Sequence, residues 1–416
     1  MLKKRFKDEL NANLTENILP YWMEKMSDPR GGYYGRRDGH DRLYEDAPKG
    51  AILQARILWT FSAAYNALHN PDYLEAARHA YDFISSNFID RMHGGAYWSV
   101  TAEGEPLDTK KQFYAIAFII YGLSEFYIAS GELNALKTAM ELFDSIETHA
   151  RDREKEGYIE AMTEDWLPIG DMRLSERDAN ASKTMNTHLH ILEGYTNLLR
   201  ALRMAKSKNT EAVSDADIER VTEATTYLLR LFLDRIENPE THHLTLFFDD
   251  DWRKFDDAES YGHDIEASWL LLETAFVLSD DKIIEETLEH TNKIALAALK
   301  GRREDGSMVY ELHGNGYLDE DRHWWVQAEN VIGQLYLARF HTDPETEAEA
   351  IYWLDSAFES WRYIADNLID PNGEWYWSIK ADSTVNRTDD KAGFWKCPYH
   401  NSRMCLEAVK ILDSFK

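Results

Sequence analysis

Gly94-Gly95-Ala96-Tyr97-Trp98 is one copy of a short pattern that recurs along the whole chain. Turn-forming residues come first and apolar or aromatic residues follow, which predicts a turn leading into a short extended segment. The other copies are Gly31-Gly32-Tyr33-Tyr34, Gly157-Tyr158-Ile159-Glu160, the glycine-free His243-Leu244-Thr245-Leu246-Phe247-Phe248, Asp305-Gly306-Ser307-Met308-Val309-Tyr310 and Asn372-Gly373-Glu374-Trp375-Tyr376-Trp377. Counted at residues 32, 95, 157, 243, 306 and 373, the spacings are 63, 62, 86, 63 and 67 residues. A spacing in the 60s holds two helices and a loop, and indicates a repeated unit.

Helix-period apolar patterns fill the segments between these turns. We expect twelve helices, at about residues 3–26, 50–69, 72–89, 109–130, 133–150, 184–204, 213–236, 261–279, 282–299, 322–341, 345–368 and 396–415. Pro71-Asp72 and Asp343-Pro344 separate paired helices. Six pairs predict an all-α fold, an (α/α)6 barrel with short β-hairpins in its connecting loops. An open helical solenoid is the alternative, and the ring is favoured because the repeat stops at six without a polar capping repeat.

The composition limits the partners of this chain. It has 46 Lys and Arg against 74 Asp and Glu, a net charge of −28. Nucleic acids and anionic membrane surfaces need basic patches, so neither is an expected partner. The 13 Trp, 22 Tyr and 17 Phe residues mostly belong to the core, but a minority in a cleft would suit a carbohydrate, whose apolar ring faces stack on aromatic rings.

The organisation of the chain predicts one domain in a reducing compartment. No linker rich in Ser, Gly or Pro divides the sequence, so we expect a single (α/α)6-barrel catalytic domain over residues 1–416. Residues 1–9 have no apolar run after their charges, which predicts no secretory signal. No stretch approaches the ~20 apolar residues of a membrane helix. Cys397 and Cys405 are too few for a disulfide framework or a zinc site, and we expect a cytoplasmic protein, a monomer or weak homodimer.

Alternate helices line the axis of an α/α barrel, and here the even-numbered predicted helices carry unusual polar residues. These lie in the first turns or just before them: Arg56, Lys110-Lys111 with Tyr114, Asn186-Thr187-His188-Leu189-His190, His263 with Glu266 and Trp269, Asp321-Arg322-His323-Trp324-Trp325 with Glu329, and Trp395 with His400-Asn401-Ser402-Arg403. A spacing of three residues places side chains on one helix face. If the even-numbered helices run parallel, these clusters meet at one mouth of the barrel.

Each of these residues also has an ordinary structural explanation. A histidine in a helix is commonly a hydrogen-bonded structural residue, which we expect of His188 and favour for His323. Asp264 is a candidate helix cap, and Glu266 and Glu329 would be surface charges if the register differs. The pairs His188/His190 and His242/His243 offer imidazoles to a metal, but both spacings suit one helix face poorly and no HExxH motif is present. We therefore predict no metal site.

The ordered set of motifs resembles the cellobiose 2-epimerases of the N-acylglucosamine 2-epimerase superfamily. The resemblance rests on Ala55-Arg56-Ile57-Leu58-Trp59, Met185-Asn186-Thr187-His188-Leu189-His190, Gly262-His263-Asp264-Ile265-Glu266-Ala267-Ser268-Trp269, Asp321-Arg322-His323-Trp324-Trp325, Gly393-Phe394-Trp395-Lys396 and Pro398-Tyr399-His400-Asn401. Any one motif is weak, but together they span residues 55–401 in order. The family's (α/α)6 barrel agrees with the repeat count.

The resemblance implies reversible epimerisation at C2 of the reducing-end glucose or mannose of β-1,4-linked disaccharides, through ring opening and a cis-enediolate. Cellobiose would give glucosyl-mannose, and lactose would give epilactose. By motif, His263 and His400 correspond to the general acid/base pair, and His190 and Arg56 to groups that assist ring opening and hold the enediolate oxygen. Positions that shape the sugar sites correspond to Tyr114, Asp178, Asn186, Glu266, Trp269, Trp325, Glu329 and Trp395.

The chemistry suits these residue types. The C2 proton of an open-chain aldose lies next to the carbonyl and can be abstracted, and inversion needs a base on one face and an acid on the other. Imidazole serves both roles near neutral pH. Arg56 would stabilise the anionic intermediate. No cofactor is expected, and no GxGxxG dinucleotide fingerprint is present.

Other functions remain open on the sequence alone. A sister epimerase or isomerase acting on mannobiose, mannose or an N-acylglucosamine differs only in the pocket beyond the reducing sugar. An inverting glycoside hydrolase would use two carboxylates, such as Asp178 with Glu266 or Glu329, about 6.5–9.5 Å apart. A non-catalytic sugar-binding protein would leave the imidazoles and the arginine in an apolar run without a purpose.

Overall fold

The computed structural model describes residues 2–176, 178–208, 213–255, 257–340 and 346–415. Its inner helices are α3 (Ala51–Leu68), α5 (Phe113–Ser130), α7 (Met185–Ser207), α9 (Tyr261–Leu278), α11 (Trp324–Phe340) and α13 (Tyr399–Ser414). Each inner helix packs on the next, and α13 packs on α3, which closes the ring. The predicted (α/α)6 barrel is confirmed, and the open solenoid is not formed.

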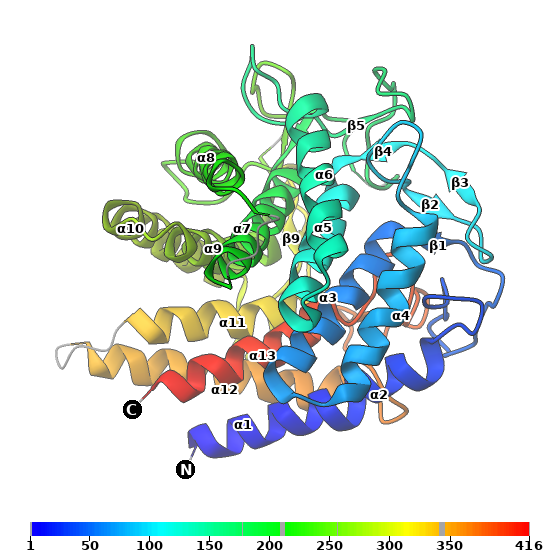
Figure 1. The fold of residues 1–416 in the computed structure, drawn as a ribbon. Helices are drawn as coiled ribbons and strands as arrows, with labels where there is room; N and C mark the ends of the chain where they lie inside the picture. Colours follow the sequence, from blue (N-terminus) through cyan, green and yellow to red (C-terminus); the bar gives the residue numbers. More distant parts are fainter. Residues whose placement is uncertain (1, 177, 209–212, 256, 341–345, 416) are drawn as a thin grey trace.

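The outer helices run antiparallel to the inner ones and cover them (Figure 1). They are α4 (Pro71–Asn87), α6 (Leu133–His149), α8 (Asp215–Leu231), α10 (Asp281–Ala298), α12 (Glu347–Asn367), and an N-terminal run made of α1 (Leu2–Ala12), the π-helix Asn13–Ile18, α2 (Leu19–Tyr21) and the π-helix Trp22–Met26. Two short turns, Phe232–Ile236 and Leu299–Gly301, prolong α8 and α10. Helix α1 contacts α13, so the two ends of the chain lie side by side.

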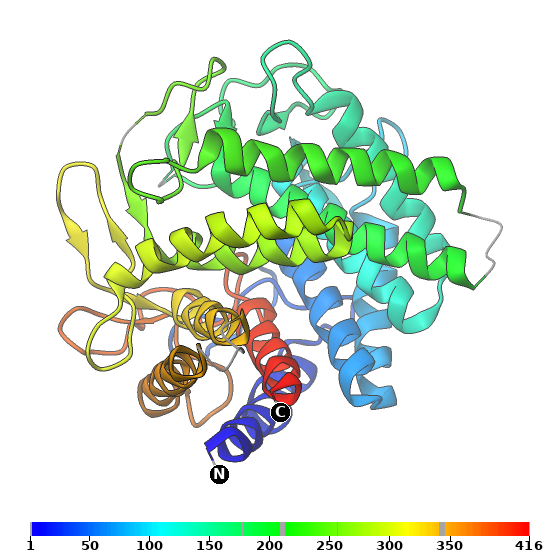
Figure 2. The same cartoon turned by 90° about the vertical axis from the view of Figure 1, so that its left-hand side faces the viewer.

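Short strands gather at one end of the ring, where Figure 2 shows the connecting hairpins. Each strand before an inner helix pairs antiparallel with a strand after the outer helix that follows. The pairs are β1 (Lys49–Gly50) with β2 (Ser99–Val100), β4 (Lys111–Gln112) with β5 (Ala161–Met162), β6 (Lys183–Thr184) with β7 (Phe247–Phe248), β8 (Glu259–Ser260) with β9 (Glu311–Leu312), and β11 (Arg322–His323) with β12 (Ser378–Ile379). Strands β3 (Pro106–Asp108) and β10 (Leu318–Asp319) extend two of these sheets.

This pairing decides where the inner helices begin. The backbone N–H of Phe113 donates to the carbonyl of Glu160 (3.1 Å), and that of Trp324 donates to the carbonyl of Trp377 (2.9 Å). Helices predicted from residues 109 and 322 therefore begin later, at Phe113 and Trp324, because the residues before them are used in strands. The helix predicted from residue 396 begins at Tyr399, directly after Pro398.

Buried Asp–Lys ion pairs recur at this end of the ring. Each aspartate follows an outer helix, and in three of the pairs the lysine lies two residues before an inner helix. The pairs are Asp28–Lys49 (2.8 Å), Asp90–Lys111 (2.6 Å), Asp152–Lys183 (3.0 Å) and Asp370–Lys391 (2.7 Å). Between α8 and α9, Asn238 takes the place of the aspartate and Glu259 takes the place of the lysine, so both charges of the pair change together. The pairs tie the end of one helix to the start of the next.

The expectation that no stretch approaches a membrane helix was wrong for α5, which is long and apolar enough to cross a membrane by length and composition, with a mean hydropathy of 1.5. In the ring it lies between α3 and α7, and 78% of it is buried. A helix that is hydrophobic all round is expected in such a position.

We predict that Lys111→Met lowers the free energy of unfolding by about 3–5 kcal/mol, because Asp90 is left as a buried carboxylate without its cation. Urea denaturation measures this. Lys293→Met removes an exposed pair with Glu289 and should cost less than about 1 kcal/mol. Adding Asp90→Asn to Lys111→Met should restore most of the loss, since asparagine still accepts the N–H groups of the turn. A loss under about 1 kcal/mol for Lys111→Met would contradict this role.

Candidate functional site

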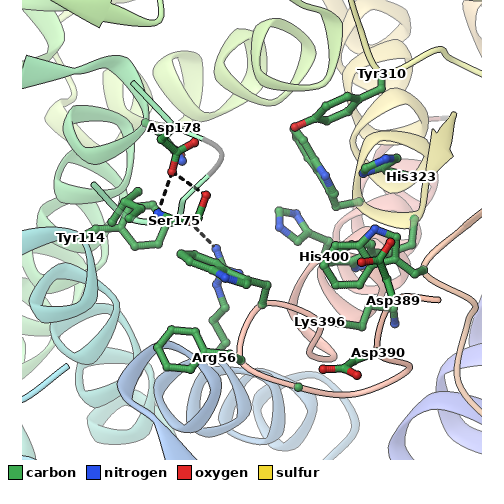
Figure 3. A pocket seen from close by; sticks show the side chains of 18 of the residues that line it. Arg56, Tyr114, Ser175, Asp178, Tyr310, His323, Asp389, Asp390, Lys396 and His400 are labelled. Carbon is green, nitrogen blue, oxygen red and sulfur yellow. Dashed lines mark hydrogen bonds between the residues drawn. The ribbon is translucent and has the colours of Figure 1, made fainter. Parts of the chain in front are cut away.

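A cavity of about 550 Å³ opens at the strand end of the ring. Its lining includes side chains from the first two turns of inner helices: Arg56 (α3), Tyr114 (α5), Asn186 and His190 (α7), His263 and Glu266 (α9), Trp324 and Trp325 (α11) and His400 (α13). Figure 3 shows Tyr114 and Asp178 on one side of the opening and Tyr310 and His323 on the other. The predicted convergence of the polar clusters at one mouth therefore occurs.

Two of the predicted histidines are held by buried glutamates. His190 Nδ1 lies 2.8 Å from Glu193 Oε2, one helical turn further along α7. His400 Nδ1 lies 2.7 Å from Glu329 Oε1 on the neighbouring helix α11. A carboxylate at Nδ1 orients an imidazole and leaves Nε2 as the nitrogen available for proton transfer.

The third histidine has a different partner. His263 Nδ1 lies 2.7 Å from the hydroxyl of Ser260, at the end of β8. Burial, and then the electrostatic influence of the nearby His190, lower the pKa of His263 to about 3. Burial, together with Arg56 and Arg403, lowers the pKa of His400 well below its ordinary value. Both imidazoles are therefore neutral at neutral pH and can accept a proton.

One guanidinium lies beneath the cavity and contacts three carboxylates. Arg403 on α13 donates to Glu193 Oε1 (2.5 Å), Glu266 Oε1 (2.7 Å) and Glu329 Oε1 (2.6 Å). It also contacts the hydroxyl of Tyr399, which in turn binds Glu193. Sequence reasoning placed Arg403 in the polar cluster of the last helix but gave it no role in the site, and it did not single out Glu193. Their signal was the three-residue spacing from His400 and His190, which sets each pair on one helix face.

The three carboxylates differ in their electrostatics. Burial alone raises the pKa of Glu193, but Arg403 and the hydrogen bond from His190 lower it to about 2. Burial, and then the charge of Glu329, raise the pKa of Glu266 to about 7. Burial also raises the pKa of Glu329. The cluster thus combines a firmly ionised carboxylate with two that hold a proton more readily.

Arg56 presents a buried cation to the cavity. Its Nη2 donates to the Tyr114 hydroxyl (2.8 Å), and its guanidinium packs over the rings of Phe118 (4.1 Å) and Tyr399 (4.8 Å). Its Nε is buried without a hydrogen-bond partner. No ion pair of Arg56 with a carboxylate occurs within the described part of the chain, so its charge is available to an anion in the cavity.

The residues predicted to shape the sugar sites fall into two groups. Tyr114, Asp178, Asn186, Glu266, Trp325 and Trp395 line the cavity. Trp269 and Glu329 lie behind its wall, where the Trp269 indole N–H donates to Glu329 (2.8 Å). Glu329 holds His400, and Trp269 holds Glu329. Contact of Trp269 and Glu329 with a sugar stays a prediction, and their place behind the wall does not favour it.

Asp178 and Asn186 separate the cavity from a second chamber of about 320 Å³. Asp178 accepts hydrogen bonds from the backbone N–H and the hydroxyl of Ser175, both at 2.9 Å. The Asn186 Oδ1 atom is buried and has no hydrogen-bond partner. The second chamber is also lined by Glu160, Tyr310 and His313, among others.

The structure shows the surroundings of the two histidines for which the sequence favoured a structural role. His188 is structural: its Nδ1 contacts the carbonyl of Thr184 (2.6 Å) and its Nε2 accepts from Tyr158 N–H (2.9 Å). His323, which the sequence favoured as structural, lines the cavity and stacks on Tyr310. Strand β11 places His323 before the helix and at the mouth, so its role, structural or functional, stays a prediction.

Asp264 does not act as the cap of its own helix. Its carboxylate accepts from Leu244 N–H (2.8 Å) and contacts His243 Nδ1 (2.6 Å), so it ties α9 to a neighbouring loop. His242 is paired with Glu237 (2.8 Å), outside the cavity. Neither His242 nor His243 lines the cavity. Glu266 and Glu329 are buried, so they are not surface charges.

Glu266, Glu329 and His400 have ligand atoms within 4.8 Å of one another, a spacing that a metal ion could use. In this structure the Arg403 guanidinium already donates to both carboxylates. The positive charge beside these carboxylates is therefore that of Arg403. The absence of a metal stays a prediction, which a chelator tests.

Comparison with known proteins follows the same motifs. The family model for N-acylglucosamine 2-epimerase (GlcNAc 2-epimerase) matches residues 32–403. A cellobiose 2-epimerase of Bacteroides fragilis is 51% identical over 406 residues, which cover 97% of this chain and 98% of that protein. One from Ruminococcus albus is 38% identical, covering 96% and 97%. The solved structure of a cellobiose 2-epimerase from Bacillus thermoamylovorans has a TM-score of 0.88 at 36% identity, covering 98% and 99%.

We predict that Glu160→Gln makes stability less sensitive to alkaline pH. Burial raises the pKa of Glu160 to about 8, from 4.5 in the unfolded chain. The folded state therefore keeps a proton that the unfolded state has lost, and this stabilisation disappears as the pH rises from 4.5 through about 8. The variant should gain at least about 1 kcal/mol on wild type between pH 5 and pH 9.

Denaturation at pH 5, 7 and 9 measures this difference. The exposed Glu289→Gln serves as the control and should show no such trend across this range. A Glu160→Gln difference that stays constant with pH would show that Glu160 is ionised in the folded protein throughout.

Proposed function

The chain belongs to the N-acylglucosamine 2-epimerase family, and we propose that it acts there as a cellobiose 2-epimerase. It is an isomerase that inverts a carbohydrate carbon. The reaction is the reversible epimerisation at C2 of the reducing-end glucose or mannose of a β-1,4-linked disaccharide. Cellobiose gives glucosyl-mannose, and lactose gives epilactose. Identity of 51% over nearly the full length of a named cellobiose 2-epimerase supports this substrate class.

One observation supports the mechanism more than any other: the imidazoles of His190, His263 and His400 line the same cavity as Arg56, which lacks a carboxylate partner among the described residues. His263 and His400 both contact Trp325, with ring centroids 4.8 Å and 5.7 Å from it. They come from different helices and have different Nδ1 partners. Such a pair suits a reaction that removes a proton from one face of a carbon and returns one to the other.

The proposed steps conserve protons. His190 takes the proton of the O1 hydroxyl and returns it to the ring oxygen, which becomes a hydroxyl as the ring opens to the aldehyde. One of His263 and His400 then takes the C2 proton, and the electron pair moves onto O1 to form the cis-enediolate. Arg56 donates to this oxygen and stabilises its charge. The other imidazole takes up a proton from solvent once the enediolate has formed and delivers it to the opposite face of C2, while the first imidazole releases the C2 proton to solvent. The roles exchange in the reverse reaction.

The shape of the site suits a disaccharide. Trp325 and Trp395 offer aromatic faces to a sugar in the main cavity, and the second chamber adds room next to it. An inverting hydrolase is less well supported, because either pair considered for it, Asp178 with Glu266 or with Glu329, needs a glutamate whose carboxylate Arg403 already binds. The pair Glu266 and Glu329 would lie too close for inversion, which needs about 6.5–9.5 Å between carboxylates to admit a water, since their oxygens lie within 4.8 Å of one another.

We also propose that the protein works in the cytoplasm, as one catalytic domain and as a monomer or weak homodimer. Cys397 and Cys405 are both free and buried, as suits a reducing compartment. The net charge of −28 supports the absence of nucleic-acid and membrane partners.

We predict that cellobiose or lactose incubated with the protein in D2O, with EDTA present, acquires deuterium at C2 and a mannose-type reducing end. Proton NMR of the sugar detects both changes, because exchange with solvent accompanies deprotonation of C2. Released monosaccharide would indicate hydrolysis instead. Loss of turnover in EDTA would show that a metal is needed.

We predict that His263→Asn and His400→Asn each lower kcat by about 10²–10⁴-fold without unfolding the protein, because each removes one proton-transfer group. Steady-state rates and thermal melting measure activity and folding. His242→Asn is the control, since His242 pairs with Glu237 outside the cavity, and its kcat should match wild type. Near wild-type turnover in either site variant would refute the assignment.

A further inference from the structure

Arg403 connects groups that the proposed reaction uses at different steps. Its Nη1 binds Glu193, which holds His190, and its Nη2 binds Glu329, which holds His400. The side chain is 1% exposed and does not line the cavity, so it cannot reach a sugar. Its influence on the chemistry must therefore pass through the two glutamates.

The geometry of a guanidinium is needed for this arrangement. Nη1 and Nη2 bind carboxylates on two sides, α7 on one and α9 and α11 on the other. A planar fork with fixed donor directions holds both carboxylates at once, whereas a lysine ammonium is a single point charge on a flexible stem. The same fork therefore decides where Nδ1 of His190 and Nδ1 of His400 can be anchored.

We propose that Arg403 is the positioning residue that fixes His190 and His400 in one common geometry. Ring opening at His190 and C2 proton transfer at His400 then depend on a single guanidinium. The importance of this coupling for turnover rests on the proposed epimerase function, but the coupling itself is a property of the free protein.

The energetics agree with a positioning role. Burying one arginine with three glutamates costs desolvation of every charge, and such clusters add little net stability compared with apolar packing. The Trp269 indole N–H and the Tyr399 hydroxyl supply further hydrogen bonds to the same carboxylates. These hydrogen bonds fix the directions of the carboxylates, and fixed carboxylates are needed to orient the two imidazoles.

The test uses the full-length protein with ¹⁵N-labelled histidine, compared as wild type, Arg403→Lys, Glu193→Gln and Glu329→Gln. NMR of the free protein reports the protonated nitrogen of each imidazole and its titration. In Arg403→Lys we expect the signals of His190 and His400 to change together, while His263, which is anchored by Ser260, keeps its own. In Glu193→Gln we expect the His400 signal to change as well, because Arg403 loses one of its anchors.

Kinetics supply the second measurement. Arg403→Lys should lower kcat about 10²-fold with KM within threefold, since a displacement of about 1 Å in catalytic groups has such an effect. Its pH profile should shift in parallel with the two histidine titrations. Adding Glu193→Gln to Arg403→Lys should cost much less than Glu193→Gln alone, because the two act as one unit.

Arg200→Lys is the matched control, a partly exposed arginine of α7 paired with Glu273 (2.7 Å) away from the cavity. It should change stability but neither kcat nor the histidine signals. Unchanged His190 and His400 signals in Arg403→Lys would overturn the proposal. If that variant does not fold, a His400 signal unaffected by Glu193→Gln overturns it equally. Failure of wild type to epimerise any disaccharide would refute the proposed function but not this coupling.

Discussion

The contact of Arg403 with Glu193, Glu266 and Glu329 is the interaction on which the site depends. Arg403 lies on α13, the helix that closes the ring between α11 and α3, and the three glutamates belong to α7, α9 and α11. A single guanidinium thus joins four of the inner helices at the depth of the cavity floor. The ring must be closed for this cluster to exist, and the cluster in turn sets the orientation of two of the three histidines.

A second constraint sets the height of the inner helices relative to one another. The strand pairs use the residues before α3, α5, α7, α9 and α11, and Asp–Lys pairs tie the residues before α3, α5 and α7 to the end of an outer helix. As a result, the polar residues of the first two turns reach the same level around the axis. Without this alignment, Arg56 on α3 and His263 on α9 would not line one cavity.

The site combines groups that are costly to bury. Neutral histidines, a cation that has no carboxylate partner among the described residues and a carboxyl with a raised pKa all line one cavity. An apolar interior would be easier to fold, because buried charges lose their hydration. The extensive apolar core of the helix pairs around them compensates for this cost, and the charges gain strength because the surrounding dielectric is low.

The sequence by itself determined the architecture and most of the site. Periodic apolar residues and turns of near-constant spacing predicted the helix pairs and the ring, because both patterns are local. The motifs placed Arg56, His190, His263 and His400 correctly in one cavity. The tertiary structure alone decided the rest. Phe113 and Trp324 begin their helices late because of pairing with distant strands. Arg403 and Glu193 became central, and Trp269 and Glu329 moved behind the wall, because contacts between helices far apart in the chain leave no periodic signal in it.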